Sequence, residues 1–489
     1  MGLNMPDVSA FVSAKATLVT GQSIRDVVEN LNETRLRSCF VMESGRVVGS
    51  ISDGDIRRGF LAGHTLETPL ENIMNTDFVS ARVGMSPAEI YRLFREGIDV
   101  IPLLDKTGEL VDLVFRGQGS TLIPVADPEI TQYEIDLVTE CVQSGWVSSV
   151  GRFVTEFEEE FAAYVGVEEA VTVSNGTAAL ELAMWTLGIG PGDEVLVPDL
   201  TFGATANAVI QVGATPVLVD VNRSTWCVDV ASLKPSVTPR TRAIMVVHLY
   251  GFPAPMTEIL EFARAHGLLV IEDCAEALGS LVDGRHVGSQ SDAGAFSFFG
   301  NKTITTGEGG MVTFSSSSLA RRARTIRGHG MSGERKYWHD EWGTNLRLTN
   351  LQAALGLAQL RRIDSILGRK LEIASRYTES LRPSLASGVE LPPAIVNGVN
   401  SHWLYVVLLP QGLRTDVVGQ RLLAMGVETR PVFYPLHVQP AFARYAGDRT
   451  FIASDEISAR GLCLPSSVKL ADADLGFVAD CVQGIVDSQ

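Results

Sequence analysis

The sequence predicts an α/β protein with more than one domain, in which a repeated N-terminal module precedes a large domain built on a mostly parallel sheet. Two observations carry this prediction. About the first 120 residues match themselves when the chain is shifted by 63 positions, and from about residue 130 helical patterns alternate with short apolar runs. At 489 residues the chain is also too long for one compact core.

Charge and cysteine content narrow the class of protein. Acidic residues number 57 against 40 basic ones, which argues against general attraction to nucleic acid or anionic lipid. The six cysteines lack the paired spacing of a zinc site or a disulfide scaffold, so we expect reduced thiols and no catalytic metal. The N-terminus does not resemble a secretion signal, and no apolar run reaches the length of about 18 residues that a membrane helix needs, so we expect a cytoplasmic protein.

The internal repeat predicts two copies of a strand-helix-strand unit within residues 1–121. The shift places residues 23–31 on 86–94, and both segments begin with a helix-capping pattern of serine followed three residues later by an acid. It also places residues 45–51 on 108–114, where a turn glycine precedes a short strand in each copy.

This module resembles a tandem CBS pair, a regulatory module that often binds adenine nucleotides. In "SISDGDIRR", Ser52 and Asp55 have the spacing with which that family holds a ribose, the carboxylate accepting hydrogen bonds from sugar hydroxyls. Phe115 and Gln118 stand at the equivalent positions of the second copy, so the resemblance implies at most one such nucleotide site. A purely structural or dimerising module is the alternative.

Residues 122–365 are predicted to form the large α/β domain, and residues 366–489 a smaller C-terminal α+β domain. A linker over 116–131 with glycines and prolines separates the large domain from the repeat. The short apolar runs of the large domain, among them "AVTVS", "EVLVP" and "LLVIED", are typical of buried parallel strands. Ligands of such sheets bind beyond the carboxyl ends of the strands.

Four features at these strand ends suggest a cofactor site. Gly176 and Thr177 open a helix whose first backbone N–H groups could hold a phosphate, and Phe202 could stack on a flat ring. Asp273 follows the run "LLVI", and Lys302 stands between an apolar run and a glycine-rich turn. Taken singly, each has an ordinary alternative: a helix cap, core packing or a solvated lysine. The spacing around Lys302 is not that of a Walker phosphate loop.

Together these features predict a site for pyridoxal 5'-phosphate. Its aldehyde needs an amine, its pyridine nitrogen needs an anion, and its phosphate needs N–H donors. Along the chain, the turn at Gly176 and Thr177 supplies the N–H donors, Asp273 the anion and Lys302 the amine. Desolvation of Lys302 would disfavour the charged ammonium and keep the amine reactive.

From about residue 123 to residue 489 the chain resembles the sugar aminotransferase family, which has the fold of type I pyridoxal phosphate enzymes. Segments that carry the resemblance include "SNGTAALELA", "EDCAEALGS", "FSFFGNKTITTGEGGMV" and "ETRPVFYPLH". The resemblance implies that Lys302 bonds to the cofactor and that Asp273 pairs with its pyridine nitrogen. It also implies that Gly176, Thr177 and Ser297 hold the phosphate and that Phe202 stacks on the ring.

Three further positions bear on assembly and reaction type. Asn345 matches a family position that reaches the phosphate of the neighbouring subunit, which implies a homodimer with shared active sites and leaves a tetramer open. Glu276 stands where many members have glutamine or histidine, so its contact with the cofactor is an open point. Relatives that dehydrate sugars replace the lysine with histidine, whereas Lys302 is retained, which favours transamination.

The segments that carry this resemblance are most similar to those of the perosamine synthase branch of the family. This implies transfer of an amino group from L-glutamate to a GDP-linked 4-keto-6-deoxy sugar, in polysaccharide or O-antigen biosynthesis, with UDP- or TDP-linked keto sugars as alternatives. His329 and Arg430 are candidates for the diphosphate or the sugar. The rival hypotheses are a nucleotide-sensing regulator with a degenerate enzyme body and a DNA-binding regulator. The acidic balance and the lack of a basic recognition helix argue against the second.

Overall fold

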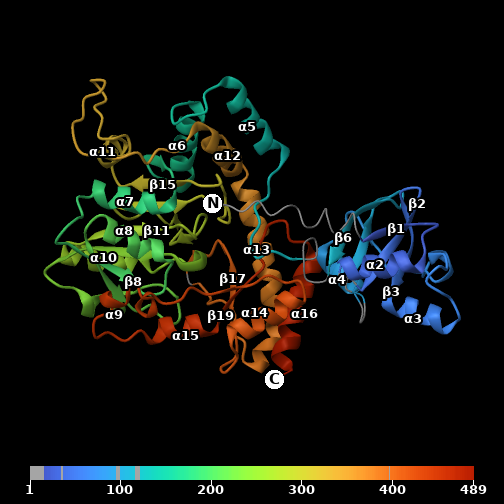
Figure 1. The fold of residues 1–489 in the computed structure, drawn as a ribbon. Coiled ribbons are helices and arrows are strands. Elements are labelled where there is room, and N and C mark those ends of the chain that lie inside the picture. The colour runs from blue at the N-terminus through green and yellow to red at the C-terminus, as the bar shows by residue number, and fades with distance from the viewer. Residues whose placement is uncertain are drawn as a thin grey trace. The chain divides into compact units, whose positions relative to one another are not determined.

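The computed structural model describes residues 16–34, 37–94, 98, 100–115, 122–395 and 397–488. The chain divides into two compact units (Figure 1). The first contains Met1–Ile123 with the short segments Gln420–Glu428 and Ala471–Phe477, and the second contains the rest of the chain. The predicted divisions after residues 121 and 365 stay predictions.

The N-terminal unit contains two small sheets of the same topology. The first orders β1 (Thr17–Val19), β2 (Ser38–Glu43) and β3 (Arg46–Ser52), and the second β4 (Ala81–Arg82), β5 (Val100–Leu104) and β6 (Leu110–Phe115). In each sheet the first pair of strands is parallel and the second antiparallel. The described strands therefore confirm the 63-residue repeat.

A helix follows the first strand of each copy, as the capping patterns predict. These helices are α2 (Ile24–Thr34) and α4 (Pro87–Leu93). Ser86 and Glu89 form a reciprocal capping box, and Asp26 accepts hydrogen bonds from the backbone N–H and the hydroxyl of Ser23. A third helix, α3 (Asp53–Leu61), begins directly after β3.

The second unit is built on a seven-stranded sheet. Its order is β7 (Glu169–Val173), β15 (Gly310–Phe314), β14 (Ala293–Ser297), β11 (Leu269–Asp273), β10 (Thr241–Val247), β8 (Glu194–Pro198) and β9 (Thr215–Val219). β15 runs antiparallel to both of its neighbours, and the remaining strands run parallel to one another. The prediction of a mostly parallel sheet is confirmed.

Helices cover both faces of this sheet (Figure 1). Alternate residues of a strand point to opposite faces, and β10 places Ile244 and Val246 in one apolar core but Ala243 and Met245 in the other. The first core is shared with α6 (Arg152–Val165), α10 (Met256–His266) and α12 (Asn350–Arg361), the second with α7 (Gly176–Thr186), α8 (Gly203–Gln211) and α11 (Ser317–Arg327). Burial on both faces explains why the strands are continuously apolar in sequence.

The long helix α13 (Ile363–Ser380) leads into a three-stranded C-terminal sheet with the order β17 (Tyr405–Leu408), β19 (Gly461–Leu464) and β18 (Arg430–Pro431). The other helices of this part are α14 (Thr415–Ala424), α15 (Ile452–Arg460) and α16 (Asp472–Asp487). Among the helices of the described residues, none has the length and apolar character needed to span a bilayer.

Two further α-helices and three short strands of the described residues belong to the second unit. They are α5 (Gln132–Ser144), α9 (Val230–Leu233), β12 (Leu281–Val282), β13 (Arg285–His286) and β16 (Gly398–Val399). β12 and β13 form an antiparallel hairpin whose turn residues Asp283 and Gly284 both have positive φ, as a two-residue hairpin turn requires.

Candidate active site

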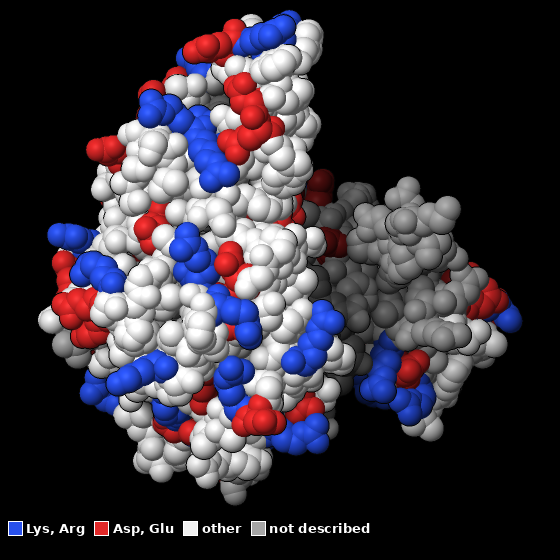
Figure 2. All heavy atoms as spheres, turned by 90° about the vertical axis from the view of Figure 1, so that its left-hand side faces the viewer, with Lys and Arg blue, Asp and Glu red and all other residues white. Residues whose placement is uncertain are grey.

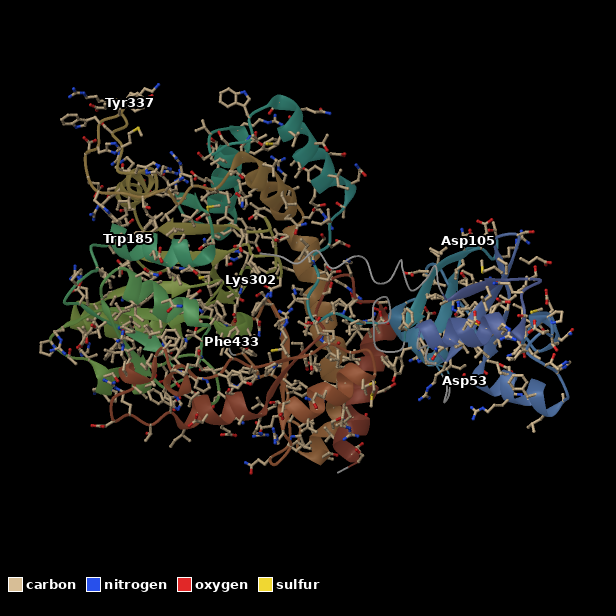
Figure 3. The ribbon with its side chains drawn as sticks, in the orientation of Figure 1. Asp53, Asp105, Trp185, Lys302, Tyr337 and Phe433 are labelled. Carbon is tan, nitrogen blue, oxygen red and sulfur yellow. The ribbon has the colours of Figure 1, made fainter. Side chains whose placement is uncertain are left out.

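A cavity of about 430 Å³ lies in the second unit, where several strands of the large sheet end. Its walls are formed by the segments that follow β7, β8, β10 and β11 and by the end of β14. Figure 3 labels two of its lining residues, Lys302 and Phe433. The predicted residues that line this cavity are Gly176, Thr177, Phe202, Asp273, Glu276, Ser297, Lys302 and Arg430.

The first turn of α7 and the end of β14 form a seat suited to an anion. The Asn175 side chain caps α7 by accepting a hydrogen bond of 2.9 Å from the N–H of Ala178. A Cβ placed on Gly176 would lie 2.7 Å from Cβ of Ser297, so only glycine lets the helix start this close to that serine. The helix N-terminus and the Ser297 hydroxyl together offer donors to a phosphate.

Asp273 is the last residue of β11, and its side chain is held at both oxygens. Oδ2 accepts a hydrogen bond of 2.9 Å from the Thr205 hydroxyl, and Oδ1 accepts one of 3.1 Å from the N–H of Ala275. Burial raises the pKa of Asp273, while the hydrogen bond from Thr205 opposes that shift. The site therefore holds a rigid, buried carboxyl group whose charged form would be stabilised by a cation bound in the cavity.

Lys302 lies beside the second acid of the cavity. Its Nζ is 3.7 Å from Oε1 of Glu276, whose Oε2 accepts a hydrogen bond of 2.9 Å from the N–H of Tyr250. Burial lowers the pKa of Lys302, and Glu276 and Asp273 oppose that shift. Burial also raises the pKa of Glu276 to about 7. Both side chains are therefore in surroundings that favour their neutral forms, as acid–base groups require.

Aromatic rings form one wall of the cavity. The side chain of Phe202 is 61% exposed, and its ring lies 5.7 Å from that of Phe433. Tyr250 stacks with Phe433 at 5.2 Å and with Trp403 at 5.9 Å. Tyr250 has a φ of 52°, a backbone conformation that is rare for a bulky residue and that occurs often at functional sites. A flat ring could lie against Phe202 from the cavity side.

Two predicted residues do not line this cavity. His329 follows α11, is exposed and lies 3.4 Å through Nε2 from Nη2 of Arg347. Asn345 is also exposed and accepts a hydrogen bond of 3.1 Å from Nε of Arg347. Tyr337 lies at the tip of the loop between them (Figure 3). The roles of His329 and Asn345 stay predictions.

Four residues for which the sequence predicted no role at the site also line the cavity: Thr205, Tyr250, Trp403 and Phe433. Tyr250 and Phe433 belong to the segments "HLYGFPAPM" and "ETRPVFYPLH", and Trp403 to "SHWLYVVLLP". The segment "ETRPVFYPLH" carries part of the family resemblance, but no local pattern indicates that these residues meet, because they come from the middle and the C-terminal part of the chain. Only the fold shows that they face Lys302.

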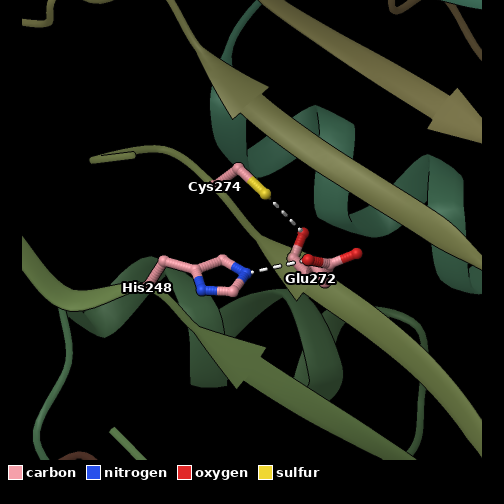
Figure 4. Close-up of side chains that lie close together, drawn as sticks. All are labelled: His248, Glu272 and Cys274. Carbon is pink, nitrogen blue, oxygen red and sulfur yellow. Dashed lines mark hydrogen bonds and ion pairs between the residues drawn. The ribbon is translucent and has the colours of Figure 1, made fainter. Parts of the chain in front are cut away.

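A buried cluster of potential metal ligands, His248, Glu272 and Cys274, lies near the cavity strands (Figure 4). Nε2 of His248 is 2.9 Å from Oε2 of Glu272, and Nδ1 accepts a hydrogen bond from the N–H of Ala254. Nε2 therefore carries the hydrogen and donates a hydrogen bond to the carboxylate of Glu272. Glu272 also accepts from the N–H of Gly288 and the hydroxyl of Ser291. Hydrogen bonds within the protein thus account for the arrangement.

In the N-terminal unit, the two predicted nucleotide-binding residues contact each other. Ser52 and Asp55 form a capping box at the start of α3, with the Ser52 N–H 2.8 Å from Oδ2 of Asp55, and Arg58 pairs with Asp55. Phe115 ends β6, and Gln118 lies outside the described residues. Ribose binding at Ser52 and Asp55 stays a prediction.

Comparison with known proteins identifies a family for each of the two regions of the chain. The DegT/DnrJ/EryC1/StrS aminotransferase family matches residues 128–483, and the CBS domain matches residues 8–62 and 70–116. The GDP-perosamine synthase of Caulobacter vibrioides is 49% identical over 358 residues, which are 73% of this chain and 96% of that protein. The GDP-perosamine synthase of Escherichia coli O157:H7 is 41% identical over 360 residues, 74% of this chain and 97% of that protein.

Solved structures support the same assignment. The aminotransferase TlmJ from Streptoalloteichus hindustanus superposes with a TM-score of 0.71 at 34% identity, covering 75% of this chain and 99% of that one. DesV of S. venezuelae, solved in complex with a ketimine intermediate, superposes with a TM-score of 0.69 at 33% identity, covering 74% and 99%. The chain carries two CBS domains and belongs to the DegT/DnrJ/EryC1/StrS aminotransferase family.

Proposed function

We propose that this protein is a pyridoxal phosphate-dependent aminotransferase that moves the amino group of L-glutamate to the ketone of a GDP-linked 4-keto-6-deoxy sugar. The observation that carries the proposal is the convergence of Lys302, Asp273 and the seat at Gly176 and Ser297 in one cavity. The GDP-linked substrate class rests on the two GDP-perosamine synthases that are 49% and 41% identical to the chain.

The residues of the cavity fit pyridoxal phosphate. The α7 N-terminus with Gly176, Thr177 and Ser297 would hold the phosphate, and Asp273 would face the pyridine nitrogen. Phe202 offers an exposed ring to stack on, and Lys302 the amine that bonds to the cofactor. When bound, the cofactor withdraws electrons from the bonds around the reacting carbon.

Lys302 is proposed to move the proton. Because burial favours its neutral form, Nζ would take the proton lost by the α-carbon of the amino donor and pass it on toward the cofactor in the first half-reaction. In the second half-reaction it would deliver a proton to the sugar carbon that receives the amino group. Glu276, 3.7 Å away, can exchange a proton with Nζ near neutral pH because burial raises its pKa to about 7. Asp273 stays in place as the anion that balances a protonated ring nitrogen, with Thr205 fixing its orientation.

The donor and acceptor can be tested separately. The enzyme is first converted with L-glutamate, and formation of 2-oxoglutarate reports the first half-reaction. It is then mixed with GDP-, UDP- or TDP-linked 4-keto-6-deoxy sugars, and return of the visible absorption of the lysine-bound cofactor reports the second. Return with the GDP sugar alone supports the proposal. Return with only a UDP or TDP sugar would replace the acceptor but keep the aminotransferase.

Assembly and regulation complete the proposal. We infer a homodimer with shared active sites, which would give exposed Asn345 a role at the partner's site, and a CBS pair that takes an adenine nucleotide. His329 and Arg430 remain candidates for binding the substrate. Figure 2 shows Lys and Arg side chains interspersed with Asp and Glu over the face it displays, which does not favour a DNA-binding regulator. The assembled cavity likewise does not favour a degenerate enzyme body.

A further inference from the structure

Trp403 lies between two lysines, of which Lys302 is half-buried and Lys370 is buried. On one side, Nζ of Lys302 lies over the indole, 3.9 Å from the ring centroid. On the other, Nζ of Lys370 donates a hydrogen bond of 3.0 Å to the carbonyl oxygen of Trp403. The indole N–H donates a hydrogen bond of 2.7 Å to the carbonyl oxygen of Asn301, the residue before Lys302. The tryptophan is 4% exposed, so these contacts fix its position.

Lys370 is an unusual residue to find at this place. It lies on α13, is 7% exposed, and donates a second hydrogen bond of 3.1 Å to the carbonyl oxygen of Ser466, which follows β19. Its acceptors are carbonyl oxygens rather than a carboxylate, and burial lowers its pKa to about 8. Below that pH a buried cation opposes folding. The two hydrogen bonds of Lys370 link α13 to the segment before β17 and to the segment after β19.

We propose that the indole of Trp403 is the resting place of Lys302 when its amine is released from the cofactor and protonated, and that Lys370 is the positioning residue that keeps the indole there. The proposal rests on the proposed role of Lys302. An aromatic face attracts an ammonium but cannot accept its proton. The released amine is thus kept close to the reacting atoms, and Glu276 remains the group beside it that can exchange its proton.

Four other acidic or basic side chains line the same cavity as Lys302, and two of them, Glu276 and Asp273, oppose the lowering of its pKa by burial. Asp273 ends β11, Glu276 follows that strand, Arg430 lies on β18, and Glu308 precedes β15. Substitutions at Trp403 and Lys370 leave all four unchanged. A change in the titration of Lys302 in those variants therefore reports the indole and its support.

The test uses the full-length protein loaded with pyridoxamine phosphate, the amine form of the cofactor, which cannot bond to Lys302. The protein is treated with fluorodinitrobenzene across a pH series, and the Lys302 adduct is quantified by mass spectrometry. The midpoint of the pH profile reports stabilisation of the ammonium, whereas the plateau at high pH reports access of the reagent. Neither readout depends on the amino donor or the sugar.

In Trp403→Leu the midpoint is expected to move to lower pH, so that labelling below the midpoint becomes about three- to tenfold faster relative to the plateau. Trp403→Phe keeps an aromatic face and is expected to keep most of the wild-type midpoint. Lys370→Met is expected to shift the midpoint in the same direction by less, and Lys370→Arg to restore it. Arg369→Met removes a cation from the adjacent position of α13, which pairs with Glu372, and serves as the matched control.

An unchanged midpoint in Trp403→Leu would overturn the resting place, and a Lys370→Met profile equal to that of Arg369→Met would overturn the role of Lys370. Thermal unfolding shows which variants are folded. If Trp403→Leu does not fold, Trp403→Phe replaces it as the test. A midpoint in Trp403→Phe that falls as far as was expected for Trp403→Leu would then overturn the resting place, because the aromatic face is still present. If Lys370→Met does not fold, Lys370→Arg replaces it as the test. A midpoint in Lys370→Arg that differs from that of wild type would then count against the role of Lys370. Failure of the amino-transfer assay leaves this readout intact, so the two hypotheses fail separately.

Discussion

The predicted site residues of the two units differ in how far apart they lie in the sequence and in how their polar groups are paired. In the N-terminal unit, Ser52 and Asp55 are three residues apart and satisfy each other at the start of α3, with Arg58 pairing to the acid. In the second unit, Asp273 and Lys302 come from separate segments and meet in one cavity. Residues that pair locally have their hydrogen-bonding needs met by the fold itself. Asp273 and Lys302, which converge from a distance, do not satisfy each other in this way and are enclosed together in the cavity.

The pKa directions express the same difference. Backbone hydrogen bonds at helix starts lower the pKa values of Asp26 and Glu89 in the N-terminal unit. Burial raises the pKa values of Asp273 and Glu276 in the cavity. The first pair of acids is stabilised in its charged form, and the second is held in surroundings that disfavour charge. Groups of the second kind are typical of catalytic sites.

The largest effect is expected from Lys302→Ala. Without this amine, neither bonding to the cofactor nor proton transfer at the α-carbon is possible, so both half-reactions are expected to fall by at least about 1,000-fold. The measurement is 2-oxoglutarate formation from glutamate. Lys469→Ala, a half-exposed lysine paired with Asp127, is the control and is expected to keep wild-type rates. Turnover of Lys302→Ala within about tenfold of wild type would remove this residue from the mechanism.

A smaller loss is expected from Asp273→Asn, which keeps the shape of the side chain and removes its charge. The ring nitrogen of the bound cofactor would lose its anion, and the rate is expected to fall on the order of 100-fold. Thr205→Val removes only the hydrogen bond to Oδ2 and is expected to cost about five- to tenfold. Single-turnover kinetics with glutamate measures both. Equal losses in the two variants would contradict the view that charge outweighs orientation here.

Glu276→Gln tests the unfavourable burial of charge through stability. The pKa of Glu276 rises from an ordinary value of 4.5 to about 7 on folding, so its contribution to stability is complete below about pH 4.5 and is lost as pH rises through 7. The glutamine variant has no such loss. In cofactor-free protein at pH 8, its free energy of unfolding is expected to exceed that of wild type by roughly 1–3 kcal/mol, with little difference between them at pH 4.5. Urea unfolding at the two pH values measures this, and a less stable variant at pH 8 would show that the ion pair with Lys302 outweighs burial.

Much of this arrangement could be predicted from the sequence, for physical reasons that differ by residue. The repeat and its helix starts are local patterns, so Ser86 and Glu89 were predictable from their spacing alone. Gly176 and Asp273 adjoin strongly apolar strands whose ends must meet at one edge of a parallel sheet. Trp403 and Phe433 were not assigned, because their places depend on how the C-terminal sheet packs and no local pattern encodes that. Tyr250 depends on a positive φ, which its neighbours in sequence do not require.

The smallest effect is expected in the N-terminal unit, where Ser52→Ala removes one half of the α3 capping box. Its cost is expected to be about 1 kcal/mol in the stability of that unit, with amino transfer in the absence of nucleotide unchanged. Asp55→Ala separates the two roles of the pair. If the acid also binds a ribose, any effect of ATP, ADP or AMP on wild-type turnover disappears in this variant, whereas Glu89→Ala, which breaks a capping box of the same kind at the start of α4, keeps it. Isothermal titration with each nucleotide, read beside turnover, decides between them. Equal nucleotide binding by wild type and Asp55→Ala would mean that the capping box is the whole function of this acid, and that the local pairing seen in the fold leaves nothing for a ligand to satisfy.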